Sequence, residues 1–158
     1  MRKASRFILP VLLCFIVGGV AAWLQRESLV LWYPTLAKPA GTPPWQVFPA
    51  VWSVLYLCMG LSAGFVLDSV SWARRSLMRL WCIQLALNFL WCVLFFNMQS
   101  PMMAMVDIIL LDVVVAMYVS TSASVSRPAA WLFVPYLCWT LYATYLNAGV
   151  VILNGTGF

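Results

Sequence analysis

The 158-residue sequence contains no histidine. This excludes the Ser-His-Asp and Cys-His catalytic arrangements, in which the imidazole is the general base. It also excludes zinc and haem sites that depend on an imidazole ligand. The five cysteines include no CxxC pair, so they indicate neither a metal site nor a disulfide framework. We expect no required metal or other cofactor.

Charged side chains are also scarce. Only 8% of the residues are charged and 65% are hydrophobic, with a mean hydropathy of +0.96, whereas soluble domains are roughly 25% charged. So few polar side chains do not cover the surface of a soluble domain, and we infer that the chain is solvated by lipid. The net charge of +5 lies mostly at the ends of apolar runs, so no nucleic-acid partner is expected.

Long apolar runs are what the sequence does contain. A helix needs about 20 mostly apolar residues to cross a bilayer, and the charges leave five such runs, at about 7–25, 46–67, 80–99, 102–122 and 129–154. None alternates polar and apolar residues as a barrel strand does. The sequence predicts an all-α integral membrane protein in which residues 1–158 form a single five-helix domain. The first run is alternatively a secretory signal, with a weak cleavage site at 20–22, although it is long for one.

The distribution of basic residues predicts the orientation. Five spans place the termini on opposite sides of the membrane. With the N-terminus inside, the outer segments hold only Arg26 and Lys38, and the inner segments hold Arg2, Lys3, Arg6, Arg74, Arg75, Arg79 and Arg127. The positive-inside rule therefore predicts a cytoplasmic N-terminus and an external C-terminus. Helical spans favour the inner membrane of a bacterium over the outer one.

The first outer connection, at about 26–45, is long and rich in aromatic residues and proline. Such connections are usually functional or disordered, but Trp32, Tyr33 and Trp45 need a surface to pack on. The prolines limit the freedom of the unfolded backbone. Two interpretations fit equally: an aromatic belt at the lipid headgroups, or a stiff lid over a cavity among the helices.

Three predicted helices carry polar and aromatic residues at helical spacing on one face. The faces are Pro49, Trp52, Tyr56, Gly60 and Ala63; Trp81, Gln84, Asn88, Trp91 and Phe95; and Tyr136, Trp139, Ala143 and Asn147. Amides are costly against lipid, so they should point into the bundle. There they either line a pocket for a flat, mostly apolar ligand or hydrogen-bond between helices at roughly 0.6–2 kcal/mol each. For any single amide the second interpretation is favoured, and helix packing best explains Gly60 and Gly64.

Two carboxylates lie within the fourth run. Asp107 and Asp112 are separated by about 140° around a helix, so they do not act as a pair from one face. Asp107 lies about one turn into the span, where it can cap the helix or reach water. Asp112 lies near mid-span, where a carboxylate is a functional candidate. A proton-coupled carrier would use such a group, and a neutral, hydrogen-bonded packing residue explains it equally well.

Several motifs together resemble the TspO/MBR family of translocator proteins and tryptophan-rich sensory proteins. Each is weak alone, but as a set they are specific and follow the family's order from about residue 30 to 148. They are Trp32-Tyr33, Leu36-Ala-Lys-Pro39, Pro43-Pro44, Val47-Phe-Pro49, Val51-Trp-Ser-Val-Leu-Tyr56, Gln84-Leu-Ala-Leu-Asn-Phe-Leu-Trp91, Phe95-Phe96, Val134-Pro-Tyr-Leu-Cys-Trp139 and Ala143-Thr-Tyr-Leu-Asn147.

The resemblance implies a five-helix bundle, often a homodimer, with a pocket closed by the first connection. Family members bind porphyrins such as protoporphyrin IX, and synthetic isoquinolines and benzodiazepines; haem is a further candidate here. By motif position the connection supplies Tyr33 and Pro43, the second helix Trp52 and Tyr56, and the fifth helix Trp139 and Ala143. The polar and aromatic faces add Asn88, Trp91, Phe95 and Asn147 to the expected ligand-binding residues.

The sequence departs from the family in two ways. The proposed cholesterol motif needs a Lys or Arg shortly after a Tyr, and none follows Tyr145. A role in cholesterol handling is therefore in doubt, and a bacterial-type role fits better. Asp112 also has no counterpart in the family pattern.

Three functions remain open from the sequence. The leading one is a membrane receptor or sensor that binds tetrapyrroles, with porphyrin transport as one use of the pocket. The second is a light- and oxygen-dependent porphyrin-degrading enzyme, because Trp52 and Trp139 match tryptophans implicated in that reaction in some bacterial members. The third is a proton-coupled carrier, for which Asp112 is the only hint.

Overall fold

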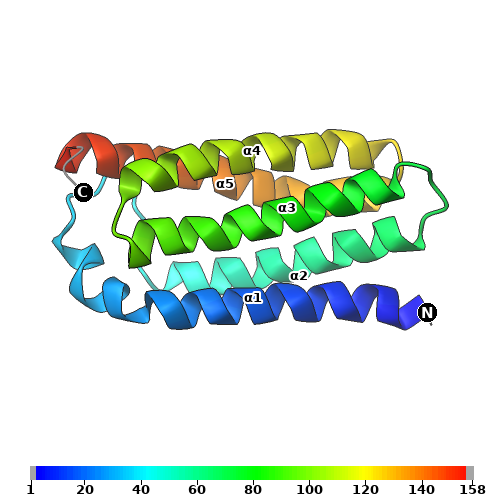
Figure 1. Cartoon of the computed structure of the whole chain (residues 1–158), viewed down its shortest axis with the longest axis horizontal. Helices are drawn as coiled ribbons and strands as arrows, with labels where there is room; N and C mark the ends of the chain where they lie inside the picture. Colours follow the sequence, from blue (N-terminus) through cyan, green and yellow to red (C-terminus); the bar gives the residue numbers. More distant parts are fainter. Residues whose placement is uncertain (1–2, 156–158) are drawn as a thin grey trace.

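The computed structural model describes residues 3–155 as a bundle of five long helices that run up and down along one axis (Figure 1). The helices are α1 (Lys3–Leu31), α2 (Val47–Asp68), α3 (Arg74–Cys92), α4 (Pro101–Ala123) and α5 (Arg127–Asn154). A short 3-10 helix, η1 (Tyr33–Thr35), follows α1, and a π-helical turn, η2 (Val93–Asn97), ends α3. α1, α2, α4, α5 and the segment formed by α3 and η2 are each long and apolar enough to cross a bilayer. This confirms the predicted all-α fold class.

The helices are longer than the apolar runs. α1 continues through Arg26 and Glu27 to Leu31, and α3 begins at Arg74 rather than near residue 80. Charged residues ended the predicted runs, but Arg and Glu are good helix formers and extend a helix into the headgroup region. The first connection therefore covers residues 32–46 and not 26–45; it is called the connection below.

Glycines allow α1 and α2 to approach closely. A Cβ at position 60 would overlap the backbone of Val11, and one at position 64 would overlap the ring of Phe7. Only hydrogen fits in these places, so the expected role of Gly60 and Gly64 in helix packing is confirmed.

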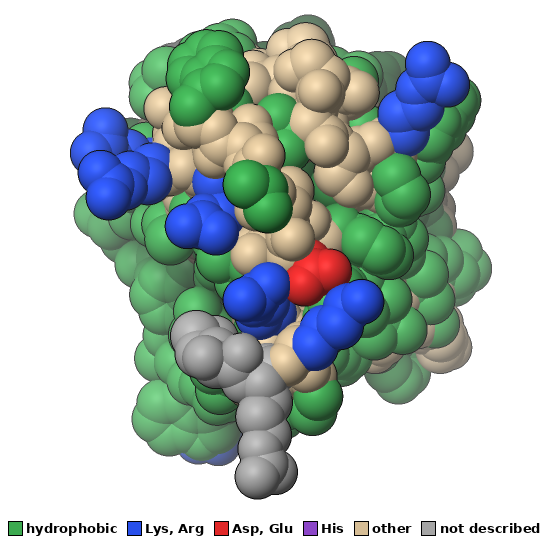
Figure 2. Space-filling view, turned by 90° about the vertical axis from the view of Figure 1, so that its right-hand side faces the viewer, with side chains coloured by type: hydrophobic (Ala, Val, Ile, Leu, Met, Phe, Trp, Pro, Cys, Tyr) green, Lys and Arg blue, Asp and Glu red, His purple; other side chains and the backbone are tan. Residues whose placement is uncertain are grey.

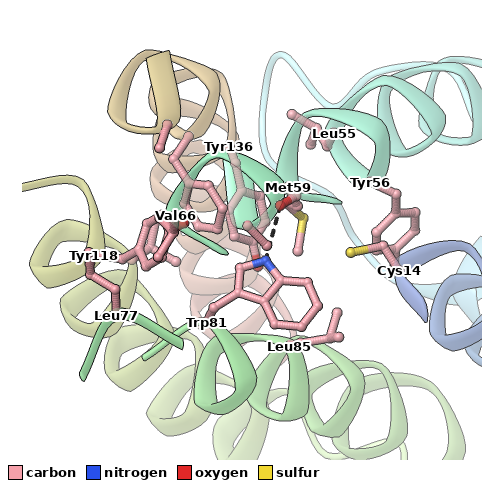
Figure 3. Packing of buried hydrophobic residues seen from close by; sticks show 14 of the residues in the cluster. Cys14, Leu55, Tyr56, Met59, Val66, Leu77, Trp81, Leu85, Tyr118 and Tyr136 are labelled. Carbon is pink, nitrogen blue, oxygen red and sulfur yellow. Dashed lines mark hydrogen bonds between the residues drawn. The ribbon is translucent and has the colours of Figure 1, made fainter. Parts of the chain in front are cut away.

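The core continues between α2, α3, α4 and α5 (Figure 3). The indole N–H of Trp81 donates to the carbonyl of Met59 (3.0 Å), and the Ser62 hydroxyl, which donates to the carbonyl of Ala129 (2.8 Å), also lies 2.9 Å from the Tyr118 hydroxyl. These bonds satisfy polar groups that lipid cannot satisfy.

The two ends of the bundle differ in charge. α1 begins at one end and α5 ends at the other (Figure 1). Figure 2 shows Lys and Arg side chains spread over the end where α1 begins. Here Asp68 accepts a 2.8 Å bond from Arg6 and lies 3.7 Å from Lys3. We call this the basic end, and the opposite one the connection end.

Candidate functional site

A cavity of about 1030 Å³ occupies the connection end of the bundle, and all five helices and the connection contribute to its wall. All ten predicted ligand-binding residues lie on this wall: Tyr33, Pro43, Trp52, Tyr56, Asn88, Trp91, Phe95, Trp139, Ala143 and Asn147. The structure thus brings together residues from four separate segments of the sequence. That they bind a ligand remains a prediction.

Trp52 and Trp139 form the centre of one aromatic wall. Their ring centroids lie 6.5 Å apart at 85°, an edge-to-face arrangement. Tyr56 lies 5.3 Å from Trp52, and Phe48 lies 5.9 Å from Trp139. Because rings at such distances stabilise one another, the wall is a preformed apolar surface.

Trp91 and Phe95 form a second aromatic wall, with rings stacked at 5.0 Å and 23°. Phe96, which was not predicted, also lies in the cavity wall. The π-helical turn explains why two successive rings point inward, since Met98 N–H bonds to Val93 O, five residues back. Such turns rotate side chains away from α-helical spacing and often occur at functional sites, and the sequence gives no signal for one here.

The amides of the wall are bonded between elements. Asn147 accepts a 3.0 Å bond from the indole N–H of Trp91 and donates a 2.8 Å bond to Pro101 O. Asn88 accepts a 3.3 Å bond from the Tyr56 hydroxyl. Asn88 and Asn147 therefore connect helices and also line the cavity; that they contact a ligand stays a prediction.

Gln84 behaves differently from the other two amides. It is buried in α3 but is not part of the cavity wall. Neither polar atom of its side chain has a hydrogen-bond partner within residues 3–155. The cavity therefore gains no polar group from Gln84.

The connection is fixed to α5 by hydrogen bonds that sequence reasoning missed. Asn154 accepts from Ala37 N–H (2.9 Å) and donates to Ala37 O (2.8 Å). The hydroxyls of Tyr142 and Tyr145 donate to the carbonyls of Gly41 and Ala40, respectively. All three side chains lie late in α5, and nothing in the sequence indicates that they meet the connection.

Pro39 reinforces this attachment. It packs directly on Gly149, where any Cβ would overlap the proline ring. This part of the connection therefore lies close against α5.

Tyr33 covers part of the cavity from the connection. Its ring lies 5.8 Å from Phe96, and the ammonium group of Lys38 lies 4.7 Å from the ring centroid. Burial, and secondly the nearby Tyr142, raise the pKa of the Tyr33 hydroxyl above its usual 10.0. The hydroxyl is therefore neutral at physiological pH and keeps a proton that it can donate to a hydrogen bond.

Two cations border this apolar cavity. Arg26 and Lys38 both line it, and neither forms an ion pair within the described part of the chain. Arg26 stacks on Trp23 at 5.0 Å, and Lys38 donates to Leu36 O at 3.0 Å. The site thus offers ring surfaces for an apolar body and two positive groups for an acidic one.

The two aspartates lie away from the cavity wall. Asp112 accepts a 2.7 Å bond from the Thr144 hydroxyl across the α4–α5 interface. Asp107 is buried, and its Oδ2 has no hydrogen-bond partner in the described structure. Within residues 3–155, no cluster of three His, Cys, Asp or Glu side chains is placed to hold a metal ion.

The chain is similar in sequence to proteins of one known family. A family model described as the TspO/MBR family matches residues 10–153. The chain is 39% identical to the tryptophan-rich protein TspO of Chlorobaculum tepidum, over 90% of this chain and 91% of that protein. It is 35% identical to the tryptophan-rich sensory protein of Cereibacter sphaeroides, over 78% and 77% of the two chains. It is 32% identical to the translocator protein of Bos taurus, over 82% and 79%.

Proposed function

The chain belongs to the TspO/MBR family of integral membrane proteins, and we propose that it is a receptor or sensor that binds a tetrapyrrole such as protoporphyrin IX in the cavity at the connection end. The observation that carries this proposal is the combination of one large aromatic cavity with Arg26 and Lys38 in its wall. Small-molecule sites typically measure about 300–1,000 Å³, so this cavity is large enough for a macrocycle.

The chemistry of the wall supports an amphiphilic ligand. Edge and face contacts from Trp52, Trp91 and Trp139 suit a flat conjugated ring. Charge-assisted hydrogen bonds from Arg26 and Lys38 suit carboxylates at its edge. Protoporphyrin IX has both features, and haem shares them. Isoquinoline and benzodiazepine ligands use the aromatic surfaces alone.

The remaining parts of the proposal concern the setting of the protein. The connection acts as the lid of the cavity, supported by its bonds to Asn154, Tyr142 and Tyr145. The protein lies in a bacterial inner membrane, with the basic end cytoplasmic, and forms a homodimer. Porphyrin transport is a use of the same cavity.

Equilibrium titration with protoporphyrin IX, followed by quenching of tryptophan fluorescence in lipid nanodiscs, tests the binding site. We expect Trp139→Phe and Trp52→Phe each to weaken binding, because each loses stacking area and an indole N–H, and the double variant to bind weakest. Trp131→Phe is the matched control, since Trp131 lies on α5 but is 71% exposed and outside the cavity wall. Unchanged affinity in all three cavity variants would refute the shared site.

A second function is favoured by the edge-to-face pair of Trp52 and Trp139. Two redox-active indoles beside a bound porphyrin suit a light-dependent breakdown of the ligand, with dioxygen as the oxidant. Illumination of the porphyrin-loaded protein in air tests this function. Products that form in the parent and in Trp131→Phe, but not in the double Trp52→Phe, Trp139→Phe variant, support the enzyme. Equal product yields in all three proteins exclude it.

A further inference from the structure

The exposed part of the cavity wall lies on one side. Among its lining residues, those on α3, η2, α4 and α5 are buried or half-buried. The well-exposed ones all belong to α1, the connection and the first turn of α2: Ala22, Arg26, Val30, Pro34, Pro44, Trp45 and Pro49. We call this set the side opening.

The side opening exists because α1 and α2 pack closely only towards the basic end. There Val11 packs against Gly60, and Phe7 packs against Gly64. The ring of Tyr56 lies against Gly18. Beyond Gly18 the facing residues of both helices line the cavity instead. The two helices thus form its floor near Tyr56 and leave its side accessible further along.

The depth of the side opening follows from helix geometry. Arg6 and Arg26 are separated by about 30 Å along α1 at 1.5 Å per residue, which equals the thickness of a hydrocarbon core of about 30 Å. With Arg6 at one boundary, Arg26 lies at the other. Trp23 and Trp45, which are 59% and 69% exposed, lie where aromatic residues mark the headgroup region. The opening therefore faces the lipid at the boundary between acyl chains and headgroups.

The connection, by contrast, is held shut on the side of α5. Asn154 bonds to both backbone groups of Ala37, and Tyr142 and Tyr145 bond to Gly41 and Ala40. Lifting the connection breaks these four bonds and separates Pro39 from Gly149. Passage between α1 and α2 breaks none of them.

We propose that the ligand enters and leaves the cavity sideways from the bilayer, between α1 and α2, and that Arg26 at the rim pairs with the acidic edge of a membrane-dissolved amphiphile. This route rests on the proposed function, because it assumes that the cavity binds such a ligand. The ligand class is an apolar body that partitions into lipid with a carboxylate that stays at the headgroups. Such a molecule meets the opening at its own depth in the membrane.

Stopped-flow exchange of protoporphyrin IX in nanodiscs tests the route. Ala22→Phe narrows the opening, so association and dissociation should both slow by about tenfold while the Kd changes less than about threefold, because an obstacle on the path affects both rates. Val20→Phe is the matched control, since Val20 lies on the same helix, is 45% exposed and does not line the cavity; its rates should equal those of the parent. Val30→Trp repeats the test at the outer end of the rim if Ala22→Phe does not fold.

A second arm examines the route beneath the connection. The double variant Asn154→Ala, Tyr145→Phe loosens the connection without altering the cavity wall. Exchange through the side opening predicts unchanged rates, whereas exchange beneath the connection predicts faster ones. Parent-like rates in Ala22→Phe and Val30→Trp, or faster exchange in the loosened variant, overturn the side route. A parent protein that binds no protoporphyrin IX at equilibrium overturns the proposed function, and the side route with it.

Discussion

Thr144 on α5 donates a 2.7 Å hydrogen bond to Asp112 on α4, across the interface of the two helices and away from the cavity wall. The other carboxyl oxygen of Asp112 is buried without a hydrogen-bond partner among the described residues. This arrangement supports a packing role for the one residue that the family pattern does not explain.

Asp112→Asn should therefore fold and bind protoporphyrin IX nearly as well as the parent, because an amide oxygen still accepts from Thr144. Thr144→Val should cost about 1–3 kcal/mol of unfolding free energy, since it leaves the buried carboxyl without its donor. Ser120→Ala on α4, whose exposed hydroxyl bonds only to Met117 O of its own helix, should change stability by less than about 0.5 kcal/mol. Denaturant unfolding in detergent measures the unfolding free energy of all three variants, and titration with protoporphyrin IX measures the affinity of Asp112→Asn. If Asp112→Asn abolishes pH-dependent uptake into proteoliposomes but leaves binding intact, the packing role is wrong and the carrier function gains support.

Asn147→Leu should destabilise the bundle more than any exposed amide substitution does. It leaves the indole N–H of Trp91 without its acceptor, at a cost of about 1–3 kcal/mol for an orphaned polar group, and it also removes the bond from Asn147 to Pro101 O at the start of α4. Asn97→Leu is the comparison, because Asn97 is exposed and makes a single 3.2 Å bond to Leu24 O. Equal unfolding free energies for the two variants would contradict the bridging role of Asn147.

Alkaline pH should destabilise the protein partly through Tyr33. Its pKa in the folded state lies above the usual 10.0 because of burial and the nearby Tyr142, so above pH 10 the unfolded chain loses this proton first. Stability is then lost as the pH rises from about 10 through the folded-state pKa. Tyr33→Phe removes this contribution, so its unfolding free energy should fall less steeply than that of the parent over the same range. Parallel curves would show that Tyr33 titrates as it does in the unfolded chain.

Reporter fusions test the orientation. A reporter before Met1 should be cytoplasmic and one after Phe158 external, because α1, α3 and α5 all begin at the basic end (Figure 1), where they place Lys3, Arg6, Arg74 and Arg127. Arg74→Glu combined with Arg75→Glu should weaken this preference, because both residues lie in the first turn of α3, directly after the short connection at the basic end. Finding both termini on one side of the membrane would mean that one helix does not cross.

The helix count and the cavity residues were predictable for physical reasons. Lipid requires a crossing helix to be long and apolar, so charges separated most of the five runs, and the polar segment Gln99-Ser-Pro101 separated the third from the fourth. Rings and amides at helical spacing, such as Trp52, Asn88 and Trp139, had to face the interior because lipid disfavours them. The family motifs then identified which interior residues share one cavity.

Other features depend on tertiary contacts that leave no local pattern. The extension of α1 to Leu31 passes through charged residues, and the inward position of Phe96 depends on a π-helical turn. In the sequence Asn154 is an ordinary residue at a helix end, and its role depends on a hydrogen bond to Ala37 in the connection, which no local pattern indicates. The same holds for the side opening, which depends on where α1 and α2 cease to touch.

Gly60 and Gly64 have a consequence for how mutational surveys of this protein are interpreted. They lie about 6 and 12 Å along α2 from Tyr56 at 1.5 Å per residue, and neither of them lines the cavity. Even alanine at position 60 forces α1 and α2 apart, because the backbone of Val11 occupies the space of a Cβ, and alanine at position 64 displaces the ring of Phe7 on α1. A shift of α1 moves the rim at Ala22 and Arg26 as well. Alleles at these two glycines will therefore resemble cavity alleles in a genetic screen, although neither residue lines the cavity.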